Sequence, residues 1–213
     1  VAFLTRLLDR TRNVINEGKR VKHSSLSTEL ENALDTNPKS FARDLGLPSS
    51  IQVDLIDFCY PPLIQSGGKY DLKVSAQNND DYLTEEGGVV LVSVGARYNS
   101  FCTNVARTVL IRPSDDMKEN YALLEEVQRV VVEKVKKGVA LNEVYEAAVK
   151  CVGEKKKEML QYFVKNVGCG VRFALCRVKL LLVYVYWCMY WCMYWCMCMC
   201  MCMCMYWYWY WYW

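Results

Sequence analysis

The amino-acid sequence predicts an α+β fold, because segments with helical periodicity flank a group of segments with strand character. Apolar residues recur with a period near 3.6 over residues 1–14, and again over 117–135 and 141–152. Between them, Val89–Ala96 and Phe101–Ile111 are short and rich in β-branched residues. The order of helices, then strands, then helices is that of an α+β domain.

Two helices are predicted before the strands. Gly18 marks the C-terminal side of the first. Ser24 or Ser25 can cap the second. The apolar face of the first helix is Val1, Leu4, Leu7, Leu8 and Val14, and that of the second is Leu26, Leu30, Ala33 and Leu34. Asn37–Pro38 and residues 47–50 then indicate a loop.

Four strands are predicted in the middle of the chain. Ile51–Tyr60 is apolar and is expected to end at Pro61–Pro62. Residues 72–76 alternate apolar and polar side chains, which is the period of a half-buried strand. Val89–Ala96 and Phe101–Ile111 are separated by a short polar link, so we expect them to pair as an antiparallel hairpin.

Two further helices are predicted after the hairpin. Pro113–Ser114 closes the last strand and caps the first of them. Its apolar stripe is Met117, Tyr121, Leu124, Val127, Val131 and Val135, and that of the second helix is Leu141, Val144, Tyr145, Ala148 and Val152.

The composition divides the 213 residues into two unlike parts. Residues 180–213 contain no charged residue, no Gly and no Pro, whereas residues 1–179 carry all 26 basic and 23 acidic side chains. The first part is too charged and too rich in aliphatic residues to be disordered. A net charge of +3 is too small to predict nucleic-acid binding, so we expect such contact to be indirect or weak.

The C-terminal part repeats Tyr-Trp-Cys-Met and then alternates Cys with Met and Tyr with Trp. It is long enough for a membrane span, and alternate Cys residues on a strand could form a thiolate metal site. We favour a third interpretation, the translation of simple-sequence DNA, since TAT-TGG-TGT-ATG encodes the repeat. We therefore expect an incomplete domain over residues 1–171, a low-complexity tail over 172–213 without function, and no membrane association. A chain that begins at Val1 is expected to start inside a longer protein.

Cysteines in residues 1–179 are scattered and odd in number, which indicates reduced thiols rather than a disulfide framework. They are Cys59, Cys102, Cys151, Cys169 and Cys176.

The hairpin carries the most informative motif. Ser93–Tyr98 reads Ser-Val-Gly-Ala-Arg-Tyr, and Phe101–Thr108 reads Phe-Cys-Thr-Asn-Val-Ala-Arg-Thr. This resembles the aminopeptidase-P and creatinase superfamily of pita-bread proteins. Active members read Asp-x-Gly-Ala-x-Tyr and then Tyr-x-Ser-Asp-x-Thr-Arg-Thr, and both Asp residues bind a pair of metal ions. The resemblance implies a partial C-terminal lobe of the pita-bread fold.

The metal-ligand positions implied by this resemblance are substituted. Ser93 and Asn104 stand where the two Asp residues would be, and Cys169 stands in the place of a His ligand. Two later Glu ligands have no counterpart. Neutral hydroxyl and amide groups cannot supply the negative charge that two cations need. We therefore expect a degenerate site with no metal, no cofactor and no catalytic residue.

Within that superfamily, the sequence is similar to the peptidase-like N-terminal domains of the large subunits of FACT-type histone chaperones. The segments that carry the resemblance are residues 21–26, 59–73, 107–114 and 165–168. The resemblance implies a non-enzymatic module that binds core histones, acts with an HMG-box partner subunit and lies in the nucleus on chromosomes. A metal-dependent Xaa-Pro aminopeptidase and a fragment anchored in a membrane by the tail are the alternatives.

Smaller features receive structural interpretations. We expect His23 to be a solvated surface residue, and Cys102 and Cys169 to be small core residues. Arg107 is expected to have a structural partner within the hairpin. The lysines of 134–137 and 155–157 are expected to be solvated at helix ends. An incomplete sheet should expose unpaired edges, so we expect poor solubility of residues 1–171 alone.

Overall fold

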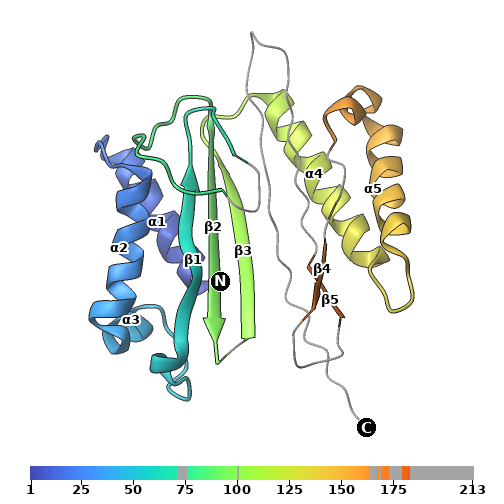
Figure 1. Ribbon diagram of the computed structural model, residues 1–213. Helices are drawn as coiled ribbons and strands as arrows, with labels where there is room; N and C mark the ends of the chain where they lie inside the picture. The colour runs from blue at the N-terminus through green and yellow to red at the C-terminus, as the bar shows by residue number, and fades with distance from the viewer. Residues whose placement is uncertain (72–75, 100, 164–166, 168, 173–178, 183–213) are drawn as a thin grey trace.

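The α+β class is confirmed by the structure, a computed structural model that describes residues 1–71, 76–99, 101–163, 167, 169–172 and 179–182 (Figure 1). In chain order the elements are α1 (Ala2–Asn16), α2 (His23–Thr36), α3 (Pro38–Asp44), η1 (Val53–Leu55), β1 (Ile56–Gln65), β2 (Val89–Tyr98), β3 (Phe101–Leu110), α4 (Asp115–Lys134), α5 (Leu141–Lys155), η2 (Lys157–Tyr162), β4 (Cys169–Arg172) and β5 (Lys179–Leu182). The first three strands form one antiparallel sheet in the order β1-β2-β3. The last two form a separate antiparallel pair.

The predicted hairpin is confirmed. Strands β2 and β3 pair without interruption from Val89 opposite Leu110 to Tyr98 opposite Phe101. Asn99 begins the tight connection with φ of 43°, a left-handed conformation that Asn tolerates better than most residues.

Strand β1 differs from its prediction at both ends. It begins at Ile56, after the short helix η1, and continues through Pro61 and Pro62 to Gln65. The prolines do not end it because β1 is an edge strand with register shifts on both sides of Tyr60, and proline is tolerated at edges and bulges.

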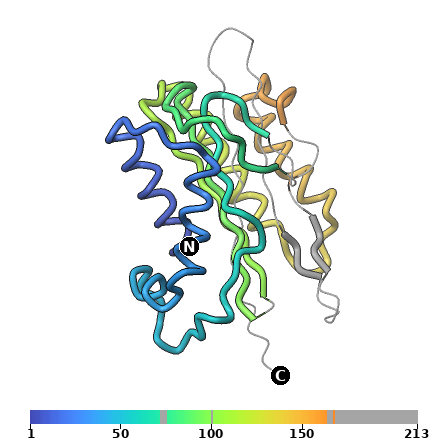
Figure 2. Tube along the Cα trace, turned by 60° about the vertical axis from the view of Figure 1, so that its left-hand side comes forward, coloured from blue at the N-terminus to red at the C-terminus, as the bar shows by residue number. Residues whose placement is uncertain are grey.

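Two helical layers cover the two faces of this sheet, and β2 contributes to both cores. Figures 1 and 2 show α1–α3 on one side of the strands and α4 and α5 on the other. Val90, Val92 and Val94 are buried in a core with residues of α1 and α2. Val89 is buried in a second core with residues of α4 and α5, against which Leu91 packs. This division follows from the alternation of side chains along a strand.

The predicted apolar stripes are buried or half-buried except at Val1 and Leu141, which are 60% and 52% exposed because they lie at the very starts of their segments. The start of α2 was predicted incorrectly, and α3 was not predicted. The expected cap at Ser24 or Ser25 is wrong, because α2 begins at His23 after Lys22 and has no side-chain cap. Residues 38–44, expected to be loop, form α3 with Pro38 in its first turn. The Asn37 side chain caps it by accepting a hydrogen bond from the Ser40 N–H at 3.1 Å.

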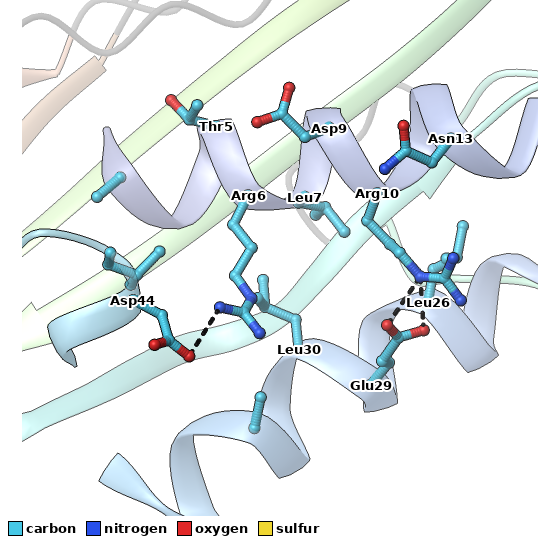
Figure 3. A pocket seen from close by; sticks show the side chains of 13 residues that line it. Thr5, Arg6, Leu7, Asp9, Arg10, Asn13, Leu26, Glu29, Leu30 and Asp44 are labelled. Carbon is cyan, nitrogen blue, oxygen red and sulfur yellow. Dashed lines mark hydrogen bonds and ion pairs between the residues drawn. The ribbon is translucent and has the colours of Figure 1, made fainter. Parts of the chain in front are cut away.

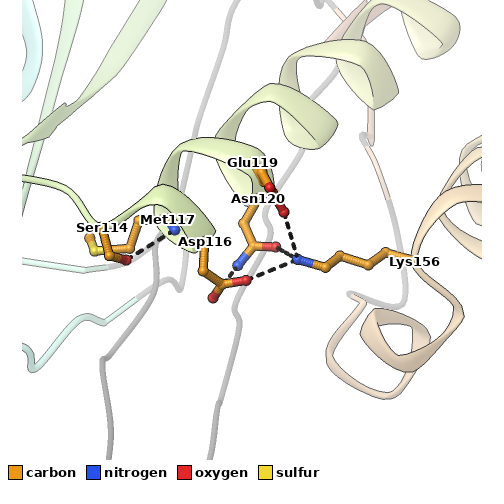
Figure 4. A network of polar contacts seen from close by, with 6 residues as sticks. All are labelled: Ser114, Asp116, Met117, Glu119, Asn120 and Lys156. Carbon is orange, nitrogen blue, oxygen red and sulfur yellow. Dashed lines mark hydrogen bonds and ion pairs between the residues drawn. The ribbon is translucent and has the colours of Figure 1, made fainter.

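Ser114 caps α4 as predicted, accepting a hydrogen bond from the Met117 N–H at 3.2 Å (Figure 4). The prediction of solvated lysines is correct for the exposed Lys134 and Lys136. It is wrong for Lys156, whose side chain is only 24% exposed. Its Nζ contacts Asp116 at 3.0 Å and Asn120 at 2.7 Å, which joins the end of α5 to the start of α4 (Figure 4).

Two predictions concern residues outside the described part of the chain. The predicted strand over residues 72–76 falls almost entirely there, and so does the tail from residue 183. Among the helices that are described, none has the length and apolar character needed to cross a bilayer. The division into residues 1–171 and 172–213 stays a prediction.

Candidate functional site

Two of the three predicted site residues, Ser93 and Asn104, lie on the face of the sheet that also packs against α4. Val89 and Leu91 meet the α4–α5 core at the start of β2. Further along the strand the same face carries Ser93 and Gly95. Asn104 of β3 lies opposite Gly95 in the register, and the Ser93 hydroxyl is 3.3 Å from the Asn104 side-chain oxygen. The structure therefore brings Ser93 and Asn104 together.

Tyr60 of β1 joins this pair. Its hydroxyl donates a hydrogen bond to the Asn104 side-chain oxygen and lies 2.9 Å from Ser93 Oγ. Gly95 makes room for the Tyr60 ring, because a Cβ added at residue 95 would lie 2.3 Å from Tyr60 Cε1. Sequence reasoning missed the role of Tyr60, although the glycine at position 95 was a signal that something approaches the strand closely.

The polar cluster of Tyr60, Ser93 and Asn104 does not fit a pair of divalent metal ions. All three side chains are neutral and hydrogen-bond one another. Divalent ions in hydrolases are held by anionic oxygens, and the bound cations lower the pKa of a water molecule that they bind. The third position, Cys169, begins β4, but its side chain lies outside the part of the structure that is described.

A rim of more exposed groups lies beside this cluster. Arg97 forms an ion pair with Asp57. Cys59 and Cys102 are both exposed, so the prediction that Cys102 is a core residue is wrong. The reason is its position near the start of β3, opposite Arg97 and far along the sheet from Val89, where α4 packs. Although Cys59 is exposed as a whole, partial burial of its thiol, followed by the influence of Cys102, raises the pKa of that thiol to about 11.

His23, predicted to be solvated, is buried with 1% of its surface exposed. Its Nε2 lies 2.8 Å from Ser66 Oγ and its Nδ1 lies 2.6 Å from Asn79 Oδ1. The Asn79 amide nitrogen donates to Asp81 at 2.7 Å, which leaves Asn79 Oδ1 to accept from the His23 Nδ1–H. Ser66 Oγ also accepts the Thr84 N–H at 3.0 Å. His23 therefore joins α2 to the end of β1 and to residues 79–84.

Other predicted positions have structural contacts. Arg107 is half-buried and donates to the Ala106 carbonyl at 2.7 Å, a contact within the hairpin as predicted. A cavity of about 550 Å³ lies between α1, α2 and α3 (Figure 3). Four of its charged groups pair with one another, since Arg10 Nε contacts both Glu29 oxygens at 2.8 and 3.0 Å and Arg6 lies 3.8 Å from Asp44.

Comparison with known proteins shows the family to which this chain belongs. The model of metallopeptidase family M24 matches residues 3–178. FACT complex subunit SPT16 of Gibberella zeae is 38% identical in an alignment of 178 positions that covers 80% of this chain and 17% of that protein. FACT complex subunit SPT16 of Mycosarcoma maydis is 40% identical in an alignment of 162 positions that covers 74% of this chain and 16% of that protein.

Solved structures support the same family assignment. The N-terminal domain of FACT complex subunit SPT16 from chickpea superposes with a TM-score of 0.69 and 35% identity, covering 79% of this chain and 38% of that domain. An X-Pro aminopeptidase from Thermotoga maritima shares the fold, with a TM-score of 0.56 and 21% identity over 79% of this chain and 42% of the enzyme. The chain thus spans about a sixth of the length of the curated relatives. It belongs to metallopeptidase family M24, and within that family it is homologous to the N-terminal domain of FACT complex subunit SPT16.

Proposed function

We propose that this chain is part of a non-enzymatic, histone-binding module of a FACT-type chaperone that reorganises nucleosomes in the nucleus. Its partners are then the core histones and an HMG-box subunit of the same complex. The homology to SPT16 supports the assignment to FACT. The observation that carries the non-enzymatic part is the neutral cluster of Tyr60, Ser93 and Asn104.

The chemistry of that cluster argues against peptide hydrolysis at this place in the fold. A two-metal peptidase requires carboxylates that hold both cations and a water molecule between them. Here the Tyr60 hydroxyl hydrogen-bonds both former ligand positions, so a cation would have to displace it. The backbone at Ser93 and Asn104 therefore keeps the fold of the family, while their side chains link strands β1, β2 and β3 through Tyr60.

Histone binding is tested with the full 213-residue chain, titrated into fluorescently labelled core histones at two salt concentrations. The chain has a net charge of +3, which has the same sign as the strongly basic histones, so overall charge does not favour association. We expect saturable binding that changes little with salt, because contacts between specific surfaces are screened less than long-range attraction. An excess of unlabelled histones should displace the labelled ones.

Peptidase activity is assayed on the same preparation with an Xaa-Pro dipeptide and added manganese or cobalt. We expect no hydrolysis above the rate of the metal alone. Absence of histone binding would refute the binding part of the proposal. Turnover that disappears on chelation would instead support the alternative, a metal-dependent Xaa-Pro aminopeptidase. Co-purification with the HMG-box subunit tests the remaining partner.

A further inference from the structure

The cavity between α1, α2 and α3 has an apolar floor and charged walls (Figure 3). Leu7, Leu26 and Leu30 form the floor, and none of them is more than 4% exposed. A volume of about 550 Å³ lies within the range of cavities that bind small ligands, so it accommodates a long side chain easily. The cavity lies on the α1–α3 side of the sheet, whereas the polar cluster lies on the side of α4 and α5.

The charged residues of this lining carry more negative than positive charge. Three carboxylates and two guanidinium groups leave the cavity with one surplus negative charge, although the whole chain has a net charge of +3. They are Asp9, Glu29, Asp44, Arg6 and Arg10. The cavity therefore attracts a cation on a chain whose overall charge repels cations.

The two ion pairs across the cavity differ in closeness. Arg10 Nε meets both Glu29 oxygens at 2.8 and 3.0 Å, so this pair is a fixed wall between α1 and α2. Arg6 lies 3.8 Å from Asp44, and its guanidinium is 4.9 Å from the centroid of the Phe41 ring. Because 3.8 Å exceeds the length of a hydrogen bond, the Asp44 carboxylate can accept a closer donor while Arg6 keeps its contact with the ring.

A lysine side chain has the shape and the charge that this cavity accommodates. The four-carbon stem of a lysine packs on apolar surface while its ammonium group stays with polar partners. The leucine floor receives the stem, and Asp44 accepts a hydrogen bond from the ammonium group at about 2.8 Å. Asp9 is a second carboxylate of the lining, and its contact with Arg12 is also loose, at 3.8 Å.

We propose that this cavity binds a lysine side chain from an extended segment of a core histone, with Asp44 as the main partner of the ammonium group and Asp9 as the second. The histone as partner rests on the proposed function, whereas the preference for lysine rests on the cavity. Along α1 the lining runs from Ala2 to Asn13. This stretch of helix is about 17 Å long, which is the length of about five extended residues.

The test measures the binding of two probes to the full 213-residue chain by fluorescence anisotropy. One probe is labelled core histones, and the other is a short labelled peptide of alternating Ala and Lys. The same peptide with every lysine acetylated keeps the stems and loses the charges, so it should bind at least about tenfold more weakly than the unmodified peptide.

Substitution of the carboxylates tests the site itself. Asp44→Asn should raise the Kd of the lysine peptide about three- to fivefold, and the double variant Asp9→Asn/Asp44→Asn should raise it about tenfold. Asp35→Asn is the matched control, because this exposed carboxylate of α2 lies outside the lining and its loss changes the net charge equally. It should change the Kd by less than about 1.5-fold. Far-UV circular dichroism checks that each variant keeps its fold.

Arg6→Gln decides the sign of the charge that the cavity binds. It removes the competing cation beside Asp44, so it should lower the Kd of the lysine peptide about two- to threefold. The control is Lys39→Gln, an exposed residue of α3 outside the lining that loses the same charge and should have a smaller effect. Weaker binding by Arg6→Gln would indicate a site for anions and would overturn the proposal.

The two probes separate the cavity from the proposed function. Equal affinity of the wild type and the double variant for the lysine peptide, or no binding of that peptide by the wild type, would overturn the cavity site. Histone binding that is unchanged in the double variant would also overturn it and would leave the proposed function intact. Binding of the lysine peptide through Asp44, in a chain that does not bind histones, would support the lysine site and refute both its assignment to histones and the proposed function.

Discussion

Gly95→Ala should destabilise the protein through Tyr60. The added Cβ would lie 2.3 Å from Tyr60 Cε1 and 2.9 Å from Cδ1 and Cζ, distances that non-bonded carbons do not reach. The Tyr60 ring must therefore move, and its hydroxyl loses the contacts with Ser93 and Asn104. Two hydrogen bonds contribute about 0.5–1.5 kcal/mol each, and overpacking costs about 1–3 kcal/mol.

The expected loss in the free energy of unfolding is thus about 2–6 kcal/mol, or a Tm lower by roughly 4–24 °C in a chain of this size. Denaturant unfolding followed by far-UV circular dichroism measures it. In a Tyr60→Ala background the same glycine substitution should cost less than about 0.5 kcal/mol, because the added methyl group meets no ring. In a Tyr60→Phe background only the steric part should remain. An equal cost of Gly95→Ala with and without the tyrosine ring would refute this reasoning.

Three other predictions follow from single contacts. His23→Ala should lower the free energy of unfolding by about 2–4 kcal/mol, because it removes a buried ring with two hydrogen bonds. The control Ser24→Ala loses one exposed contact and should cost less than about 1 kcal/mol in the same denaturant titration. Lys156→Met should lower Tm by a few degrees, equivalent to about 1 kcal/mol, because it removes the contacts of Lys156 with Asp116 and Asn120. Lys150→Met removes an exposed ion pair with a 3.8 Å separation from Glu154 and should change Tm by less than half as much. Alkylation of Cys59 should accelerate with pH up to an inflection near 11 rather than near the ordinary value of about 8.5, because only the thiolate reacts and partial burial raises the pKa of this thiol; an inflection at the ordinary value would contradict this reasoning.

The candidate site was only partly predictable. The spacing of Ser93 and Asn104 in the hairpin was enough to place them together, because antiparallel pairing through a tight turn fixes which residues face each other. The third member, Tyr60, comes from a strand 33 positions earlier than Ser93, and a bulge sets its direction. Neither the bulge nor the passage of β1 through two prolines has a local signal that distinguishes it from the end of a strand.

The sequence by itself determined the α+β class, the β2–β3 hairpin and most of the apolar positions of α1, α2, α4 and α5, because these depend on periodicity and turn residues within one segment. Only the tertiary structure decided that His23 is buried, that Lys156 joins two helices and that Cys102 is exposed. Each of these outcomes depends on partners about 40 or more positions away, or on where a neighbouring helix stops covering the sheet. The local sequence pattern around a polar residue is the same whether its side chain is solvated or hydrogen-bonded to a distant partner. Burial of the side chain is favourable only when that partner is present, and the partner is set by the tertiary structure.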